Sequence, residues 1–254
     1  MVIPCIDMKI ILIGAGNLAT QLAVALQKKG MTPAYIYSRT RESAEQLSER
    51  LRDVPYSTDI SRVPTDGDLY IFAVKDSALL DLVSRMPSNR GLWVHTAGSM
   101  DMEVFAPYTA RYGVFYPMQT FSKERETDFD DIPIFVETNH TDDTERLQKL
   151  AGRLSTKVYE ATSEQRKYLH LAAVFACNFS NHLYALCDRI LSEHGLPFET
   201  MLPLIRETAA KVADMPPAQA QTGPAIRYDK NVIDKQMALL SDPTMPVSYT
   251  HLTL

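Results

Sequence analysis

A glycine-rich turn near the start of the chain has the residue types and spacing of a dinucleotide-binding loop. Residues 14–19 read GAGNLA, the GxGxxA form of that motif, between an apolar run and a helical pattern. The first glycine permits a tight turn, the second lets a pyrophosphate approach the backbone, and the alanine allows close helix packing. Free N–H groups at a helix start attract phosphate. The predicted pyrophosphate site consists of Gly14, Gly16, Asn17, Leu18 and Ala19; a glycine turn that binds nothing is the alternative.

The residues after the second predicted strand indicate which nicotinamide cofactor the turn would serve. A carboxylate about 20 residues after the glycines would bind the ribose 2′-hydroxyl of NAD. This chain has Ser38, Arg39 and Thr40 there instead. An arginine between two hydroxyl side chains suits a 2′-phosphate, so the sequence predicts NADP. The alternative is that Arg39 is a solvated residue at the start of a helix.

Further candidate residues follow the next two predicted strands. Ala73, Val74 and Lys75 lie at the carboxyl edge of the expected sheet, where ligands bind in doubly wound folds, and are predicted to contact the cofactor. A solvated Lys75 is the alternative. His95 opens the segment HTAGS, whose small and hydroxyl side chains suit close approach by nicotinamide or substrate. His95 titrates near neutral pH and is a candidate acid–base catalyst, with a structural histidine as the alternative.

Four polar residues in the second half of the chain are candidates for contact with a substrate. His170 is the first candidate for the proton donor or acceptor, ahead of the histidine at the strand end, and Asn178 would orient the substrate. In a regular α-helix these two residues lie about 12 Å apart along the axis and could border one cleft. Arg227 would hold a substrate carboxylate, with Thr222 adding a hydroxyl contact. Purely structural roles in a helical core or loop are the alternatives.

Strand and helix patterns alternate through residues 1–160, which is the signature of βαβ units. Apolar runs predict strands at residues 9–13, 34–37, 68–74, 92–95, 112–115, 132–136 and 157–159. Helical periodicity predicts helices at residues 17–29, 41–51 and 141–154. The predicted fold class is therefore α/β, with a Rossmann-like, mainly parallel sheet domain at residues 1–160.

The pattern becomes helical from residue 161. Proline is absent between Pro133 and Pro197, and apolar residues recur at helical spacing through residues 163–194. Further helices are predicted at residues 198–213 and 229–240. This all-helical domain, residues 161–244, is expected to bind substrate and form a homodimer, because its apolar stripes exceed what a small domain buries internally. Residues 245–254 have neither a helical period nor a cap, and are expected to be a non-native tail.

Composition and charge exclude several classes of protein. The 254 residues are 45% hydrophobic and 22% charged, which excludes a disordered chain. The formal net charge of -5 argues against nucleic acid as a partner. No run approaches the roughly 20 apolar residues of a membrane span, and the start lacks the basic region of a signal peptide, so a cytoplasmic protein with no membrane partner is expected. Three cysteines without CxxC spacing predict no metal site.

Seven motifs give the chain a family resemblance. They resemble motifs of the Rossmann-like oxidoreductases that carry a C-terminal DUF2520 domain. More distantly, the chain is similar to pyrroline-5-carboxylate reductase, ketopantoate reductase and the β-hydroxyacid dehydrogenases. The resemblance implies an NADP- or NAD-dependent enzyme that dimerises through helices, and it names no substrate. The motifs are GAGNLA (14–19), AVKD (73–76), HTAGS (95–99), YPMQTFS (116–122), HLAAVFACN (170–178), LPLIRET (202–208) and QTGPAIRYD (221–229).

The chain departs from these relatives at two places. The distant relatives have a catalytic lysine four residues before an asparagine, whereas Val174 stands four residues before Asn178. Family members often have His-Pro where this chain has Tyr116-Pro117, which argues against an essential acid–base role there. The predicted reaction is hydride transfer between nicotinamide and a small carbonyl, alcohol or imine substrate. The alternatives are a catalytically silent NADP-binding sensor or assembly protein, and an imine reductase similar to pyrroline-5-carboxylate reductase.

Overall fold

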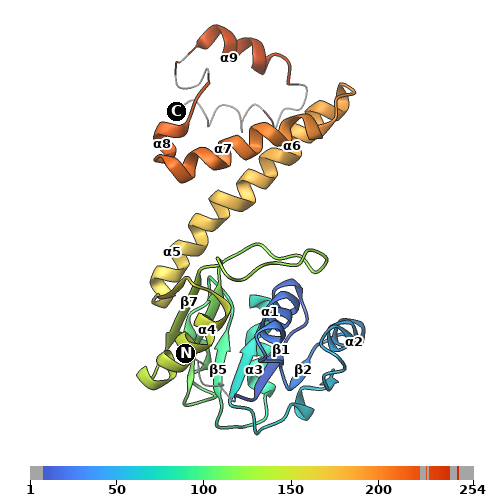
Figure 1. Ribbon diagram of the computed structural model, residues 1–254, viewed down its shortest axis with the longest axis vertical. Coiled ribbons are helices and arrows are strands. Elements are labelled where there is room, and N and C mark those ends of the chain that lie inside the picture. Colours follow the sequence, from blue (N-terminus) through green and yellow to red (C-terminus); the bar gives the residue numbers. More distant parts are fainter. Residues whose placement is uncertain (1–7, 224–226, 228, 241–244, 246–254) are drawn as a thin grey trace. The chain divides into compact units, whose positions relative to one another are not determined.

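The chain divides into two compact units, Met1–Val174 and Phe175–Leu254. The computed structural model describes residues 8–223, 227, 229–240 and 245 (Figure 1). The first unit is built on a sheet and the second is helical, which confirms the predicted fold class. The sequence predicts a domain boundary after residue 160, whereas the first unit also includes the helix that follows. Of the predicted tail, residues 245–254, only Met245 lies among the described residues.

The described part of the first unit contains one eight-stranded sheet with the order β3-β2-β1-β4-β5-β6-β7-β8. Neighbouring strands are parallel except for the antiparallel pair β6 and β7. This arrangement confirms the predicted Rossmann-like sheet. The strand order reverses between the parallel strands β1 and β4, and such folds bind ligands at this switch point. The strands are β1 (Ile10–Ile13), β2 (Tyr35–Tyr37), β3 (Tyr56–Ser57), β4 (Leu69–Phe72), β5 (Leu92–His95), β6 (Tyr112–Pro117), β7 (Ile134–Thr138) and β8 (Val158–Glu160).

Alternate residues of the buried strands supply two main cores, one on each face of the sheet, and a smaller third cluster contains Tyr116 of β6. Ile10 and Leu12 of β1 pack with the apolar sides of α1 (Asn17–Lys28), α2 (Arg41–Arg50) and α4 (Thr141–Leu154). The intervening β1 residues face the aromatic core beneath α3 (Asp76–Arg85). Burying each large aliphatic side chain contributes about 1.5–3 kcal/mol. The two cores fix the strand ends that carry the site.

The sequence does not predict β3, α3 or the two short 3-10 helices of this unit, Ile60–Arg62 and Met102–Phe105. β3 has only two residues, too few to show a strand period. Helix α3 has ten residues, as many as α2, and its buried residues Leu79, Leu82 and Val83 are at helical spacing, so a helical pattern is present there although the helix is not among those predicted. The remaining strands and helices of the unit confirm the predicted elements with shifts at their ends.

The helices after the sheet are α5 (Ser163–Ala173), the π-helix η3 (Val174–Phe179), α6 (Ser180–Glu193), α7 (Leu202–Asp214), α8 (Pro217–Ala220) and α9 (Lys230–Met237). The expectation of one regular α-helix over residues 163–194 is wrong at η3, because a π-helix pairs residues five apart and changes the angular spacing. The predicted α-helical register from His170 to Asn178 therefore does not hold. A 3-10 turn, Phe198–Met201, replaces the start of the helix predicted at 198–213. None of the described helices has the length and apolar character to cross a membrane.

Candidate functional site

The glycine-rich turn joins β1 to α1 at the carboxyl edge of the sheet. Gly14 has φ +126°, a conformation open only to glycine, and its N–H donates to the carbonyl of Tyr37 at 2.7 Å. A Cβ on Gly14 would overlap the carbonyl of Ala73 at the end of β4. Ala19, in the first turn of α1, is fully buried. The turn therefore has the tight backbone packing that the motif predicts.

The start of α1 presents backbone donors to open space. Gly16 is the N-cap residue, no side chain caps the helix, and no acidic residue lies in the first turn. A Cβ on Gly16 would find no atom within 4 Å. An uncapped helix N-terminus carries partial positive charge and unsatisfied N–H groups. The residues present thus fit the pyrophosphate of a dinucleotide.

The predicted 2′-phosphate residues lie between β2 and α2. The Ser38 side chain is buried, whereas Arg39 and Thr40 are exposed. Thr40 is the N-cap of α2 and makes no side-chain capping bond. In the described part of the chain, the Arg39 guanidinium forms no ion pair or hydrogen bond. Its charge remains available for an anion.

The end of β4 lies beside the glycine-rich turn, because β4 pairs with β1. Ala73 is buried and its N–H donates to the carbonyl of Ile13 at 2.8 Å. Val74 is half-buried, and Lys75 is the exposed N-cap residue of α3. Asp76 accepts a hydrogen bond from the Ser99 hydroxyl and so ties this edge to the segment after β5.

His95 is fully buried at the end of β5, and the backbone uses both of its ring nitrogens. The Ala97 N–H donates to Nδ1 at 3.2 Å, and Nε2 lies 3.3 Å from the carbonyl of Asp101, to which it donates in this tautomer. Burial, assisted by the positive charge of Arg166, lowers the pKa of His95 to about 4. A neutral histidine with both nitrogens occupied organises the loop, an arrangement that favours the structural alternative over acid–base catalysis.

His170 lies where three elements of the first unit meet. Its Nδ1 is 3.1 Å from the hydroxyl of Tyr116, at the end of β6. The imidazole packs against Gly98 after β5, where an added Cβ would lie 2.5 Å from Nδ1. His170 is half-buried, and its Nε2 has no hydrogen-bond partner among the described residues. The sequence motifs contain all three residues but do not predict their contact.

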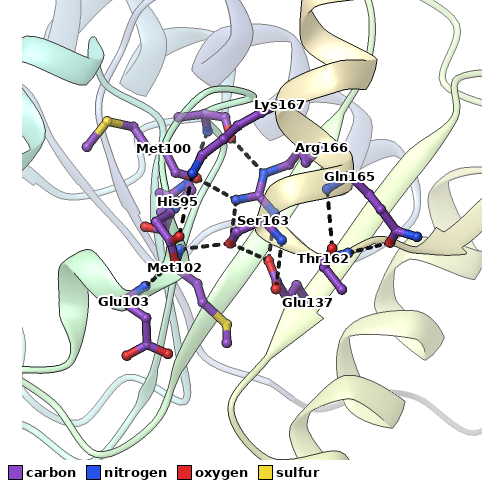
Figure 2. Close-up of polar contacts among 12 residues, drawn as sticks. His95, Met100, Met102, Glu103, Glu137, Thr162, Ser163, Gln165, Arg166 and Lys167 are labelled. Carbon is purple, nitrogen blue, oxygen red and sulfur yellow. Dashed lines mark hydrogen bonds and ion pairs between the residues drawn. The ribbon is translucent and has the colours of Figure 1, made fainter.

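Arg166, which none of the sequence motifs contains, is buried on α5 one turn before His170. Figure 2 shows its polar contacts. Its Nη1 donates to Glu137 of β7 at 2.7 Å, and Nη2 donates to the Met100 carbonyl at 2.5 Å and to Ser163 Oγ at 3.1 Å. Its Nε donates to the Ala97 carbonyl at 3.2 Å. Only the capping box at the start of α5, Thr162 with Gln165, is visible in the sequence as TSEQ.

The segment between β6 and β7 crosses α1 next to the glycine-rich turn (Figure 1). Gln21, buried on α1, donates to the Ser122 carbonyl at 2.7 Å and accepts from the Thr127 N–H at 3.1 Å. Asn17 donates to the Phe121 carbonyl at 3.1 Å. Asn17 therefore holds the segment between β6 and β7 against α1, in addition to any contact with phosphate.

Three candidate residues belong to the second unit. Asn178, Thr222 and Arg227 are all exposed there. Their substrate roles stay predictions. Among the described residues, no group of three or more His, Cys, Asp or Glu side chains could hold a metal ion.

Comparison with known proteins identifies the family. One family model, the Rossmann-like domain, matches residues 3–118, and another, a domain of unknown function named DUF2520, matches residues 132–254. A crystal structure from Bacteroides fragilis, provisionally described as an NADP oxidoreductase, is 51% identical with a TM-score of 0.91 and covers 97% of this chain and 96% of its own. The chain belongs to the Rossmann-like proteins with a DUF2520 domain. A search of curated proteins gives no match to it.

More distant solved structures share the fold of this DUF2520 protein. An imine reductase from Myxococcus stipitatus in complex with NADP+ is 17% identical, with a TM-score of 0.66, covering 91% of this chain and 86% of its own. A pyrroline-5-carboxylate reductase from Coxiella burnetii is 16% identical, with a TM-score of 0.61, covering 97% of this chain and 94% of its own. At these identities the likeness concerns the fold alone.

Proposed function

We propose that this protein is an NADP-dependent oxidoreductase that transfers hydride between nicotinamide and a small carbonyl, alcohol or imine substrate. The observation that carries the proposal is the uncapped N-terminus of α1, which faces open space at Gly16. The Arg39 guanidinium after β2, which forms no ion pair or hydrogen bond with any described residue, supports it. The provisional description of the 51% identical relative supports the same cofactor. A location in the cytoplasm stays a prediction.

Residues of the first unit would bind the cofactor and transfer the proton in this reaction. The N–H groups of α1 bind the pyrophosphate, and Arg39 with Thr40 binds the 2′-phosphate. The cofactor, when bound, supplies or accepts the hydride at nicotinamide C4. His170 moves the accompanying proton at the substrate oxygen or nitrogen through Nε2, while its Nδ1–H donates to the Tyr116 oxygen. In reduction the imidazolium gives the Nε2 proton, and in oxidation the neutral ring accepts it.

A catalytically silent NADP-binding sensor is the second candidate, and an imine reductase is an enzymatic variant of the first. The sensor is favoured by Val174, which occupies the place of the lysine that the distant relatives use. Absorbance of NADPH during incubation with keto acids, aldehydes and cyclic imines separates these functions. Oxidation with one substrate class supports the enzyme and identifies that class. Tight NADPH binding without oxidation by any member of the panel would support the sensor.

The cofactor preference depends on Arg39. Arg39→Ala is expected to weaken NADPH binding by at least about tenfold and to change NADH binding little, because a charge-assisted hydrogen bond contributes roughly 1.5–3 kcal/mol. Titration of both cofactors at fixed ionic strength measures this. Lys149→Ala, which removes the same charge from α4, is the control and should bind both cofactors as the wild type does. Equal affinity of the wild-type protein for NADPH and NADH would contradict the NADP assignment.

We also propose that the second unit forms a homodimer. Within its described residues only Ile233 and Met245 are buried apolar side chains, whereas many large ones are exposed. Apolar exposure of this extent is typical of an interface. The exposed set includes Phe175, Phe179, Leu183, Ile190, Leu196, Leu204 and Val212.

Light scattering is expected to give the mass of a dimer at micromolar concentration. Leu204→Asp should shift the population toward monomer, because a buried unpaired carboxylate would be costly in the interface. Lys211→Asp, on the same helix but already paired with a glutamate, is the control. A wild-type monomer at high micromolar concentration would refute the dimer.

A further inference from the structure

We propose that Arg166 is a positioning residue, which holds the backbone of residues 97–100 against α5 and thereby places His170 for proton transfer. The inference rests on the proposed function, because it assigns Arg166 a part in that reaction. Every residue it uses lies in the first unit, so the network is contained in one compact body.

The Arg166 guanidinium joins three separate parts of the fold (Figure 2). Its Nη1 pairs with Glu137 at the end of β7, and its Nε and Nη2 donate to the Ala97 and Met100 carbonyls after β5. Ser163, one turn earlier on α5, also bonds to Glu137 and accepts from the N–H of Met102. The planar fork of an arginine matches these fixed acceptors, whereas a lysine offers one point charge.

The backbone that Arg166 holds is the surface against which His170 packs. Gly98 lies between the two anchored carbonyls, and it is in direct contact with the His170 imidazole. Arg166 and His170 are four residues apart on α5 and therefore share one face of the helix. The backbone N–H of Ala97 is fixed in turn by His95. A shift of the 97–100 backbone would displace the imidazole from Tyr116.

Stability alone does not account for this arrangement. The Arg166 side chain is 1% exposed and that of Glu137 is 15% exposed, so both charges lose most of their hydration. A buried ion pair of this kind is often matched or exceeded in stability by apolar side chains of similar volume. What apolar side chains cannot supply is donors for the carbonyls of Ala97 and Met100. A variant with apolar side chains therefore separates the effect of Arg166 on stability from its effect on the position of residues 97–100.

The decisive variant is the double replacement Arg166→Met with Glu137→Leu, which removes both charges and avoids an unpaired buried one. We expect a folded protein whose melting temperature is lowered by the loss of donors to the Ala97 and Met100 carbonyls and of the Ser163 bonds to Glu137. Turnover should fall by at least about tenfold, and the NADPH dissociation constant should change less than about threefold. Amide hydrogen exchange at residues 97–100 should be at least about tenfold faster. Arg166→Lys keeps the charge but removes the planar guanidinium, and its turnover should also fall. This variant tests the need for the guanidinium geometry if the double variant is unstable.

A second ion pair provides the matched control. Arg111, which directly precedes β6, makes a bidentate pair with the buried Asp143 of α4, and neither side chain bonds to residues 97–100 in the described part of the chain. Arg111→Met with Asp143→Leu should leave turnover within about twofold of wild type and exchange at residues 97–100 unchanged.

The outcomes separate the two proposals. Wild-type turnover and wild-type exchange at residues 97–100 in the folded Arg166 variants would show a merely structural arginine and overturn the inference. If the wild-type protein binds NADPH but turns over no substrate, the proposed function fails. The exchange rates, together with the NMR resonances of the His170 imidazole in the same variants, then decide whether Arg166 positions this site.

Discussion

Replacing His170 by glutamine is expected to lower turnover by about 100-fold or more while the affinity for NADPH stays nearly unchanged. Glutamine keeps a polar side chain beside Tyr116 and Gly98 but cannot exchange a proton near neutral pH. The half-buried imidazole, whose Nε2 has no partner among the described residues, is placed for that exchange. Steady-state kinetics with the substrate class found by the panel, and a fluorescence titration of NADPH, measure the two quantities.

Two further variants make this test specific. Tyr116→Phe removes the hydroxyl at Nδ1 and should give a smaller loss than the histidine variant, because it alters orientation and leaves the proton carrier in place. His140→Gln, at an exposed histidine before α4, is the control and should retain wild-type turnover. Unchanged turnover in the His170 variant would reject the assignment, and the buried, neutral His95 would not replace it without a large change in its surroundings.

Two alanine substitutions in the glycine-rich turn are expected to differ sharply in their effect on stability. Gly14→Ala should lower the free energy of unfolding by about 3 kcal/mol or more and abolish cofactor binding, because φ is +126° and the new Cβ would overlap the Ala73 carbonyl. Gly16→Ala should leave the melting temperature nearly unchanged, since its φ is -79° and the space around it is open. Thermal unfolding of both variants measures the contrast.

Cofactor titration completes this test. Gly16→Ala should weaken NADPH and NADH alike, by at least about tenfold, because the methyl group would stand where the pyrophosphate approaches the backbone. Its effect thereby differs from that of Arg39→Ala, which acts on NADPH alone. A Gly16→Ala protein that binds NADPH with wild-type affinity would contradict a dinucleotide at this turn.

The sequence by itself determined the features that depend on neighbouring residues. GAGNLA predicts the turn, since the demands on its glycines are set by a strand entering and a helix leaving within six residues. Apolar runs predict most of the sheet because each buried strand must be covered on both faces. The residues after the second strand, Ser38 to Thr40, are located by the same argument. A two-residue edge strand such as β3 has no pattern to detect.

The tertiary structure alone decided how the polar side chains of the site are paired. Arg166 and Glu137 are 29 residues apart in the chain, and His170 and Tyr116 are 54 apart. These pairs form where α5 crosses the ends of β5, β6 and β7, and β7 runs antiparallel to β6. The π-helix at residues 174–179 likewise changed a register that regular α-helical spacing predicts.

These side-chain pairs could not be predicted because a sequence pattern indicates which side chains are buried, whereas a hydrogen bond requires two groups at a fixed distance and angle. Local periodicity predicted the strand that ends in His95. Only the folded structure showed that Ala97 and Asp101 occupy both ring nitrogens and that burial, assisted by the charge of Arg166, lowers the pKa and keeps the ring neutral. The fold of the same segment after β5 also places Gly98 in contact with His170. The folded structure therefore favours a structural role for His95 and leaves His170 as the candidate for proton transfer.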